Sequence, residues 1–282
     1  MQTTKFLAAS SDSSASDLVL FGLPFDGTCS FRPGARFGPK AIREMSDGLE
    51  TYCPILRRDL EEVSFSDVGD MPLPPGDKES AMALTYQMAK HVHENGQIPA
   101  ALGGEHLLSL PLVRAAHEAH PDLVLIQFDA HMDLRNSYLG VELSHATVMR
   151  RIGEIIDPSR ILQVGQRSGT REEYQRAETF GNLRTEQVTV AELQQWVADR
   201  PLYVTVDLDV LDPSVLPGTG TPEPGGVSFS QLQSWIAGLA SCNWIGWDVV
   251  ELSPLLDPSS VSSIVSAKIV RTMILTSTAT RC

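Results

Sequence analysis

Eight short apolar runs alternate with amphipathic stretches along the chain, and this alternation restricts the possible folds more than any other feature. Each run is rich in branched or aromatic residues and has the length of a buried β-strand, whereas the intervening stretches keep helical spacing. The predicted strands are residues 18–22, 63–68, 98–102, 123–128, 161–165, 187–190, 202–206 and 245–250. The predicted helices are residues 40–45, 80–94, 107–119, 146–156, 191–199, 228–240 and 260–275. This order predicts a parallel sheet covered by helices on both faces, with ligands at the carboxyl ends of the strands.

Three ionisable side chains directly follow the fourth predicted strand. In the sequence Asp129-Ala130-His131-Met132-Asp133 they stand where an apolar run ends. If the segment stays extended, side chains at positions i, i+2 and i+4 point the same way and converge. Carboxylates gathered away from water cost several kcal/mol unless a cation binds them. A polar loop is the alternative interpretation, but the pattern favours a metal site.

Two other strands deliver ligand-type residues to the same edge of the sheet. The run 202–206 is followed by Asp207 and Asp209, and the run 98–102 is followed, after a glycine turn, by His106. Because the carboxyl ends of parallel strands share one edge, these groups are predicted to meet the first three. The candidate metal ligands are His106, Asp129, His131, Asp133, Asp207 and Asp209. Four carboxylates and two imidazoles are mostly hard donors, which suit manganese or magnesium.

Length and composition favour one large domain. A chain of 282 residues with 42% hydrophobic and 20% charged residues can bury a large core. Because no repeat, linker or charge block divides the chain, we expect residues 1–282 to form a single domain. Residues 1–16 end in a serine-rich segment that is too polar to pack, and they are expected to be flexible.

Charge and hydropathy narrow the class of partner and the compartment. The formal net charge of −13 argues against nucleic acid and anionic membranes, and it favours cationic small molecules. No apolar run reaches the length of about 18 residues that a membrane helix needs, and no secretory signal is visible. The four cysteines are far apart and form no CxxC pair, which favours reduced thiols. A soluble, cytoplasmic protein is therefore expected.

Five spaced motifs give the chain a resemblance to a known family. They are Gly103-Gly104-Glu105-His106, Asp129-Ala130-His131-Met132-Asp133, Ser144-His145-Ala146, Asp207-Leu208-Asp209-Val210-Leu211-Asp212-Pro213 and Pro217-Gly218-Thr219-Gly220-Thr221. In this order they resemble the ureohydrolase family of arginases and agmatinases, and most of all its bacterial agmatinase branch. The resemblance implies a three-layer α/β/α arginase-like fold with an eight-stranded parallel sheet and a site for two manganese ions.

The resemblance also implies how the six candidate ligands divide between the two ions. One manganese takes His106, Asp129, Asp133 and Asp207, and the other takes His131, Asp129, Asp207 and Asp209. Asp129 and Asp207 then bridge both ions. A hydroxide held between the ions attacks the guanidinium carbon of the substrate, which yields urea and a primary amine.

Three residues carry the remaining chemistry that the resemblance implies. Asp133 accepts the hydroxide proton in addition to binding metal, and His145 relays protons to the leaving amine, a task for a group that titrates near neutral pH. Glu251 pairs with the guanidinium, because a bidentate carboxylate suits its planar fork. His145 and Glu251 are thus expected to contact substrate. A helix-capping or surface role is the alternative for His145.

The expected substrate is agmatine, whose hydrolysis to putrescine and urea is a step of polyamine biosynthesis. Arg135 stands where the resemblance would place the polar amide that holds the amino acid end of arginine, which counts against arginine. The expected rim, residues 134–143 and 167–173, carries acids as well as arginines, so guanidinobutyrase or arginase activity is the alternative. The rim charges are Glu142, Glu172, Glu173, Arg135, Arg167 and Arg171.

Two other classes of protein are alternatives to the hydrolase. A deacetylase-like metalloenzyme needs fewer ligands, and a non-catalytic binding relative would lack a ligand, whereas all six are present. The resemblance alone predicts a homo-oligomer, either a trimer or a hexamer.

Overall fold

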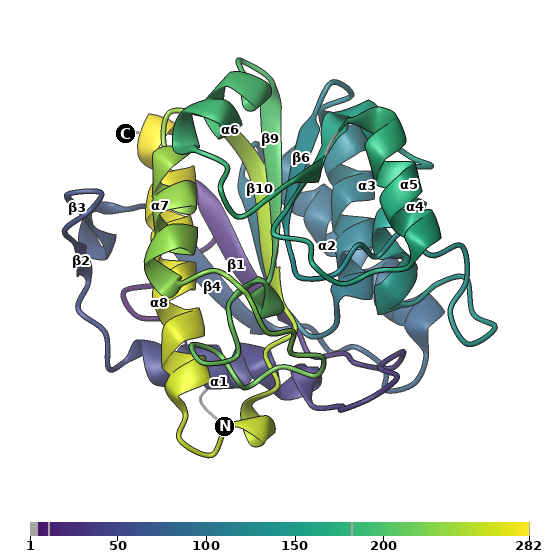
Figure 1. Ribbon diagram of the computed structural model, residues 1–282. Helices are drawn as coiled ribbons and strands as arrows, with labels where there is room; N and C mark the ends of the chain where they lie inside the picture. The colour runs from purple at the N-terminus through teal and green to yellow at the C-terminus, as the bar shows by residue number, and fades with distance from the viewer. Residues whose placement is uncertain (1–4, 11, 182, 282) are drawn as a thin grey trace.

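Eight parallel strands form the central sheet of the computed structural model, which describes residues 5–10, 12–181 and 183–281 (Figure 1). In spatial order they are β4 (Phe65–Asp70), β1 (Leu18–Leu23), β5 (Ile98–Gly103), β10 (Asn243–Val250), β9 (Pro201–Asp207), β6 (Val124–Phe128), β7 (Ile161–Val164) and β8 (Leu183–Arg184). Each neighbouring pair in this order is parallel. The predicted eight-stranded parallel sheet is therefore confirmed.

Helices cover both faces of the sheet and complete the three predicted layers (Figure 1). One hydrophobic cluster holds the apolar side chains of α1 (Gly38–Ser46), α6 (Val190–Val197), α7 (Phe229–Gly238) and α8 (Val261–Ser277). A second cluster holds those of α2 (Lys78–Glu94), α3 (Ser109–Ala119) and α4 (Val148–Ile152). The remaining helix, α5 (Arg171–Phe180), lies on the same side of the sheet as α4 (Figure 1).

The pleat of the strands explains the two clusters. In β1, Leu18 and Leu20 pack in the first cluster, whereas Val19 and Phe21 pack in the second. Successive side chains of a strand point to opposite faces, so a strand covered on both sides must be apolar throughout. This is why the strands could be recognised as continuous apolar runs.

A short hairpin stands apart from the main sheet. Its strands β2 (Tyr52–Cys53) and β3 (Arg58–Asp59) are antiparallel, and the sequence analysis did not predict them. Within the described ranges, Cys29, Cys53 and Cys242 are free thiols, as expected. Over the same ranges, no helix combines the length and the apolarity that crossing a bilayer requires.

One predicted strand was wrong. Residues 187–190 do not form a strand, and the last strand of the sheet is β8, a few residues earlier. Thr189 instead begins α6, because its hydroxyl accepts a hydrogen bond from the backbone N–H of Glu192 while Glu192 Oε2 accepts one from the N–H of Thr189. This reciprocal cap places the start of α6 at Val190, one residue before the helix predicted at residues 191–199.

The N-terminal segment was expected to be flexible and too polar to pack, but some of its described residues are buried or bonded to the domain. Phe6 is 1% exposed and belongs to the first hydrophobic cluster. Ser10 forms a parallel bridge with Ser66 of β4, and the Nε2 of Gln97 donates to the carbonyl oxygen of Ser16 at 2.6 Å. Backbone pairing therefore offsets the low hydrophobicity of the serines. Residues 1–4 and 11 lie outside the described part.

Candidate metal centre

Four adjacent strands bring the candidate residues to one edge of the sheet. β9 ends in Asp207, and Asp129 directly follows β6. Glu251 directly follows β10, and β5 leads through Gly104 to His106. A Cβ atom on Gly104 would lie 1.9 Å from the backbone oxygen of Phe25, so this turn requires glycine. The strand order thus converts four distant sequence positions into neighbours.

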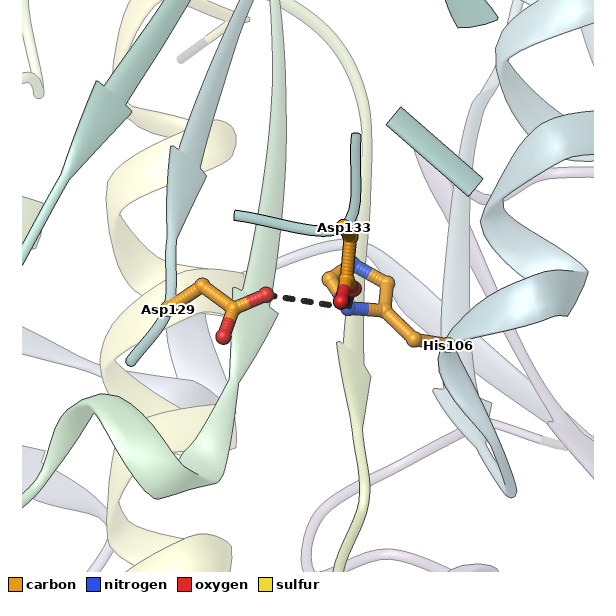
Figure 2. A group of neighbouring side chains, drawn as sticks. All are labelled: His106, Asp129 and Asp133. Atoms are coloured by element: carbon orange, nitrogen blue, oxygen red, sulfur yellow. Dashed lines mark ion pairs between the residues drawn. The ribbon is translucent and has the colours of Figure 1, made fainter. Parts of the chain in front are cut away.

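His106 lies at the centre of the first group of ligands. Its Nδ1 atom is 3.2 Å from Asp129 Oδ2, 3.2 Å from Asp133 Oδ2 and 3.3 Å from Asp207 Oδ2. Figure 2 shows the carboxylates of Asp129 and Asp133 directed at the imidazole of His106. All four residues are buried. One nitrogen and three carboxylate oxygens therefore surround a common point.

The side chains after β6 meet through a turn, and not through the strand alternation from which their convergence was predicted. The chain bends at Ala130, where the Oδ1 atom of Asp129 accepts a hydrogen bond from the N–H of His131 at 2.6 Å. Asp133 has a positive φ of 52°, which is uncommon outside glycine. Its carbonyl oxygen accepts bonds from the N–H groups of Met149 and Arg150. Contacts with the following helix thus hold Asp133 in a strained turn.

A second group of ligands surrounds His131. Its Nδ1 atom is 3.0 Å from Asp209 Oδ2 and 3.6 Å from Asp129 Oδ1. Asp129 therefore offers one oxygen to each group, which is the arrangement that a bridging carboxylate needs. Asp207 faces His106 through Oδ2, while its Oδ1 accepts the N–H of Asp209 at 3.0 Å. The structure thus brings all six predicted ligands together.

The donor set fits divalent metal ions. The Nδ1 atom of His106 is buried and has no hydrogen-bond partner among the described residues, although three carboxylates face it. A buried nitrogen without a hydrogen-bond partner destabilises a protein, because it has lost its contact with water and gained nothing in return. Buried polar groups are therefore almost always paired. A cation between this nitrogen and the carboxylate oxygens would satisfy all of them. The mostly oxygen ligands favour a hard ion.

The pKa values of the clustered residues indicate that the centre favours bound positive charge. Burial disfavours an imidazolium at His106, yet Asp129, Asp133 and Asp207 outweigh burial and raise its pKa well above the usual value. Burial and the neighbouring Asp209 and Asp129 raise the pKa of Asp207 well above its usual value. Burial and the charge of Asp129 raise the pKa of Asp133 to about 6. Crowded carboxylates thus take up protons where a metal ion would otherwise neutralise them.

A cavity of about 200 Å³ opens onto the centre. Its lining residues are Ser30, His106, His131, Met132, Asp133, Arg135, Tyr138, His145, Ala146, Ser168, Gly169, Glu173, Asp207, Thr221 and Glu251. His145 and Glu251, the two predicted substrate contacts, are both part of this wall. Asp129 and Asp209 lie beneath it and are 0% and 1% exposed. A small polar molecule in the cavity would therefore contact the metal ligands and both predicted contacts together.

Comparison with known proteins identifies the family. The model of the arginase family matches residues 16–276. The chain belongs to the arginase family. An agmatinase of Bacillus anthracis is 43% identical over 265 residues, which cover 92% of this chain and 91% of the relative. A guanidinopropionase of Pseudomonas aeruginosa is 35% identical, over 93% of this chain and 86% of the relative.

Solved structures agree with this assignment. The agmatine ureohydrolase of Thermoplasma volcanium superposes with a TM-score of 0.87 at 31% identity, over 100% of this chain and 96% of that one. The arginase-like fold predicted from the motifs is therefore confirmed.

Glu251 of this arginase-family protein is held in an uncommon backbone conformation. Its φ is 68°, and its N–H donates to the carbonyl oxygen of Gly104 at 2.9 Å. Its Oε1 atom accepts the N–H of His106 at 2.7 Å. Desolvation raises the pKa of this half-buried carboxyl above its usual value, so a bound cation would stabilise its charged form. A strained turn thus anchors an acid in the cavity wall.

His145 is half-buried and differs electrostatically from the expectation. Desolvation lowers the pKa of its imidazole to about 4, so the ring is neutral at pH 7 instead of titrating near neutrality. Its Nε2 lies 3.3 Å from the hydroxyl of Ser30, and its ring meets that of Tyr138 edge to face at 5.8 Å. The backbone N–H donates to the hydroxyl of Thr28 at 3.2 Å. These contacts fix the ring at the cavity wall.

Glu105, which precedes the predicted ligand His106, is buried and is not part of the cavity wall within the described structure. It is 1% exposed, and its carboxyl accepts the backbone N–H and the hydroxyl of Thr28 at 2.8 and 2.9 Å. Burial raises its pKa to about 7. Since the Thr28 hydroxyl also accepts the N–H of His145, Glu105 supports the position of His145 through Thr28.

Only some of the charged residues predicted for the rim line the cavity. Of its six charged residues, Arg135 and Glu173 line the cavity within the described structure. Arg167 instead donates to backbone carbonyls, including those of Asp209 and Glu223, and so fixes two loops. Ser30 also lines the cavity and was not a predicted site residue, because it lies in a loop far from the other site residues in sequence and belongs to no recognisable motif.

Proposed function

We propose that this arginase-family ureohydrolase converts agmatine to putrescine and urea with the help of two Mn²⁺ ions. The observation that carries the proposal is the meeting of two imidazoles and four carboxylates beside a cavity with Glu251 in its wall. The agmatinase from Bacillus anthracis supports the choice of substrate. Urea release from agmatine, measured with metal-free and Mn²⁺-supplemented protein, tests the proposal. Mn²⁺-dependent urea is expected, and its absence with every guanidino compound would contradict the proposal.

The six donors would hold the two ions in overlapping sets. His106, Asp129, Asp133 and Asp207 would hold one, and His131, Asp129, Asp207 and Asp209 the other. When bound, the two cations supply a water molecule acidic enough to become a nucleophile near neutral pH. Two divalent cations and four aspartates sum to zero charge. A nucleophilic hydroxide would add one negative charge, which a guanidinium would neutralise, and the carboxylate of Glu251 would pair with that guanidinium.

The residues of the chain bind the substrate and move protons. Glu251 holds the guanidinium through its carboxylate, which positions the guanidinium carbon over the centre. Asp133 accepts a proton at a carboxylate oxygen, and the imidazole of His145 passes a proton to the amine nitrogen that leaves. A neutral ring suits this task, because it can accept a proton at one nitrogen and donate one from the other.

Replacement of His145 by Ala should chiefly lower kcat. We expect a decrease of about a hundredfold, at the lower end of the effect of a general acid. The reason is that a ring with a pKa of about 4 carries the proton in only a small fraction of molecules near neutral pH. KM for agmatine should change little, since Glu251 still binds the guanidinium. Steady-state urea assays from pH 6 to pH 10 measure both constants. His91→Ala, at an exposed site on α2, is the control, and a His145→Ala enzyme with wild-type kcat throughout would exclude the proton relay.

The cavity wall carries charges of both signs, so it leaves two substrate classes open. Glu173 is 4% exposed, and its two oxygens accept the N–H groups of Leu134 and Thr170 at 3.0 and 2.8 Å. Arg135 lies 3.7 Å from this carboxylate and 4.9 Å from the ring centre of Tyr138. Glu173 suits the ammonium of agmatine. Arg135 suits the carboxylate of guanidinobutyrate, which is the alternative substrate.

We expect the order agmatine, guanidinobutyrate, arginine in kcat/KM. Agmatine should exceed guanidinobutyrate by about tenfold, because the acidic protein attracts a dication and Arg135 is already paired with Glu173. It should exceed arginine by about a hundredfold, since the extra carboxylate must be desolvated without a free partner. Urea release at equal low concentrations measures the order. Faster turnover of guanidinobutyrate would refute the substrate assignment and leave the metal centre intact.

A further inference from the structure

A row of buried polar side chains crosses four adjacent strands below the metal centre. Gln163 of β7 is paired with Gln127 of β6, Gln127 with Thr205 of β9, and Thr205 with Asp248 of β10. None of these residues is more than 3% exposed. Gln127 and Thr205 stand two residues before the ligands Asp129 and Asp207, so their side chains lie on the same face of the sheet. Polar residues at buried strand positions require partners.

Asp248 is surrounded by hydroxyl groups. Its Oδ1 is 2.6 Å from the hydroxyl of Thr205 and 2.9 Å from that of Ser109, and its Oδ2 is 2.7 Å from the hydroxyl of Tyr203. An ionised carboxylate only accepts hydrogen bonds, so each of these hydroxyls donates to it. The single proton of Thr205 is thereby committed to Asp248.

The direction of this hydrogen bond from Thr205 determines which ring nitrogen of His106 carries a hydrogen. The Nε2 atom of His106 is 3.0 Å from the Thr205 oxygen. Because the Thr205 hydroxyl already donates to Asp248, its oxygen can only accept here, and Nε2 must carry a hydrogen. In a neutral imidazole the lone pair then lies on Nδ1, the atom that faces Asp129, Asp133 and Asp207. The hydrogen-bond chain therefore selects the tautomer that can bind metal.

We propose that Thr205 and Asp248 are positioning residues that hold His106 as the Nε2–H tautomer and aim its Nδ1 at the cation. This inference rests on the metal centre of the proposed function and adds two residues that do not bind metal or line the cavity. Without the hydroxyl of Thr205, the buried Nε2–H loses its acceptor and the ring loses its orientation. Metal affinity typically falls when such a partner of a histidine ligand is removed.

The other two residues of the row, Gln163 and Gln127, orient the carboxylate of Asp129 in a similar way. The Nε2 of Gln163 donates to the Oε1 of Gln127 at 2.7 Å, which leaves the amide nitrogen of Gln127 to face Asp129. That nitrogen donates to Asp129 Oδ2 at 2.5 Å. The bridging carboxylate is therefore oriented from below by an amide whose direction is fixed in turn.

Thr205→Val tests the proposal, because valine keeps the shape of threonine and replaces its hydroxyl with a methyl group. The full-length chain is stripped of metal and titrated with Mn²⁺, and free Mn²⁺ is followed by electron paramagnetic resonance. The wild type should bind two ions. In Thr205→Val the site containing His106 should bind about tenfold to a hundredfold more weakly, while the other site keeps its affinity.

Two variants separate the hydroxyl from packing. Thr205→Ser restores the hydroxyl and should bind Mn²⁺ within about twofold of the wild type. Thr85→Val removes another fully buried hydroxyl, which bonds within α2 to the carbonyl of Ala81, and should leave both sites unchanged. Thermal unfolding of the metal-free proteins compares their stability. If the valine variant does not fold, Thr205→Ala provides the same comparison.

The outcomes are distinct. Two unweakened Mn²⁺ sites in a folded Thr205→Val protein would overturn the proposal, as would a Thr205→Ser protein that binds as weakly as the valine variant. A wild type that binds two ions but releases no urea from agmatine would refute the proposed substrate and leave this titration valid. A wild type that binds no Mn²⁺ would overturn both proposals.

Discussion

Asp207→Ala is expected to abolish urea release, with a loss of more than about ten-thousandfold in kcat/KM. Asp207 Oδ2 lies 3.3 Å from His106 Nδ1, and Asp207 Oδ1 accepts the N–H of Asp209, so the carboxylate connects the two groups of ligands. Its removal leaves three aspartates to balance two divalent ions. The net charge of the loaded centre then becomes positive, and both ions should be lost. Elemental analysis of metal per chain and the urea assay measure the two effects.

A neighbouring acid provides the matched control for this variant. Asp212 lies in the same loop, five residues later, but its carboxylate accepts bonds from Ser214 and from the N–H groups of Gly225 and Gly226. It does not line the cavity within the described structure. Asp212→Ala should therefore keep its metal and its activity while the loop becomes less stable. An Asp207→Ala protein with two ions per chain and intact activity would disprove the ligand assignment.

The architecture could be predicted from the sequence because its signals are local. Strands such as β1 and β6 are buried on both faces, so nearly every residue in them is apolar and the run is visible without any alignment. Alternation with helices then requires parallel pairing, and parallel pairing gathers the residues after each strand at one edge. His106, Asp129 and Asp207 were found in this way.

The start of α5 was missed, although its signal was a cap. Thr170 and Glu173 form a reciprocal cap that begins α5, and Thr189 and Glu192 do the same for α6. Both pairs have the Thr-x-x-Glu spacing that marks a helix start in a sequence. The spacing could have shown that residues 187–189 lead into α6 instead of forming a strand, and it could have revealed α5 within the expected rim.

Other features depended on long-range contacts and had no local signal. The positive φ angles of Asp133 and Glu251 arise because distant segments hold each turn, so the sequence could show the acids but not their direction. The polar row was partly visible, since Gln127, Thr205 and Asp248 interrupt strands that are otherwise apolar. Only the register shows that these interruptions are adjacent.

Glu251→Gln should lower kcat/KM for agmatine by about a thousandfold, which corresponds to roughly 4 kcal/mol. The substitution keeps the size of the side chain and an oxygen that can accept the N–H of His106, so the turn after β10 should persist. It removes the negative charge that is proposed to pair with the guanidinium. The charge acts on the bound substrate and on the transition state alike. Both a higher KM and a lower kcat are therefore expected.

Glu223→Gln gives the comparison that assigns this effect to the cavity. Glu223 accepts a bond from the hydroxyl of Ser168 at 3.1 Å but does not line the cavity among the described residues. Its variant should stay within about threefold of the wild type, because it removes a charge outside the cavity. Mn²⁺ binding should survive in both proteins, since neither residue is a ligand. If Glu251→Gln changed KM and kcat no more than Glu223→Gln does, the guanidinium would have to be held by another group.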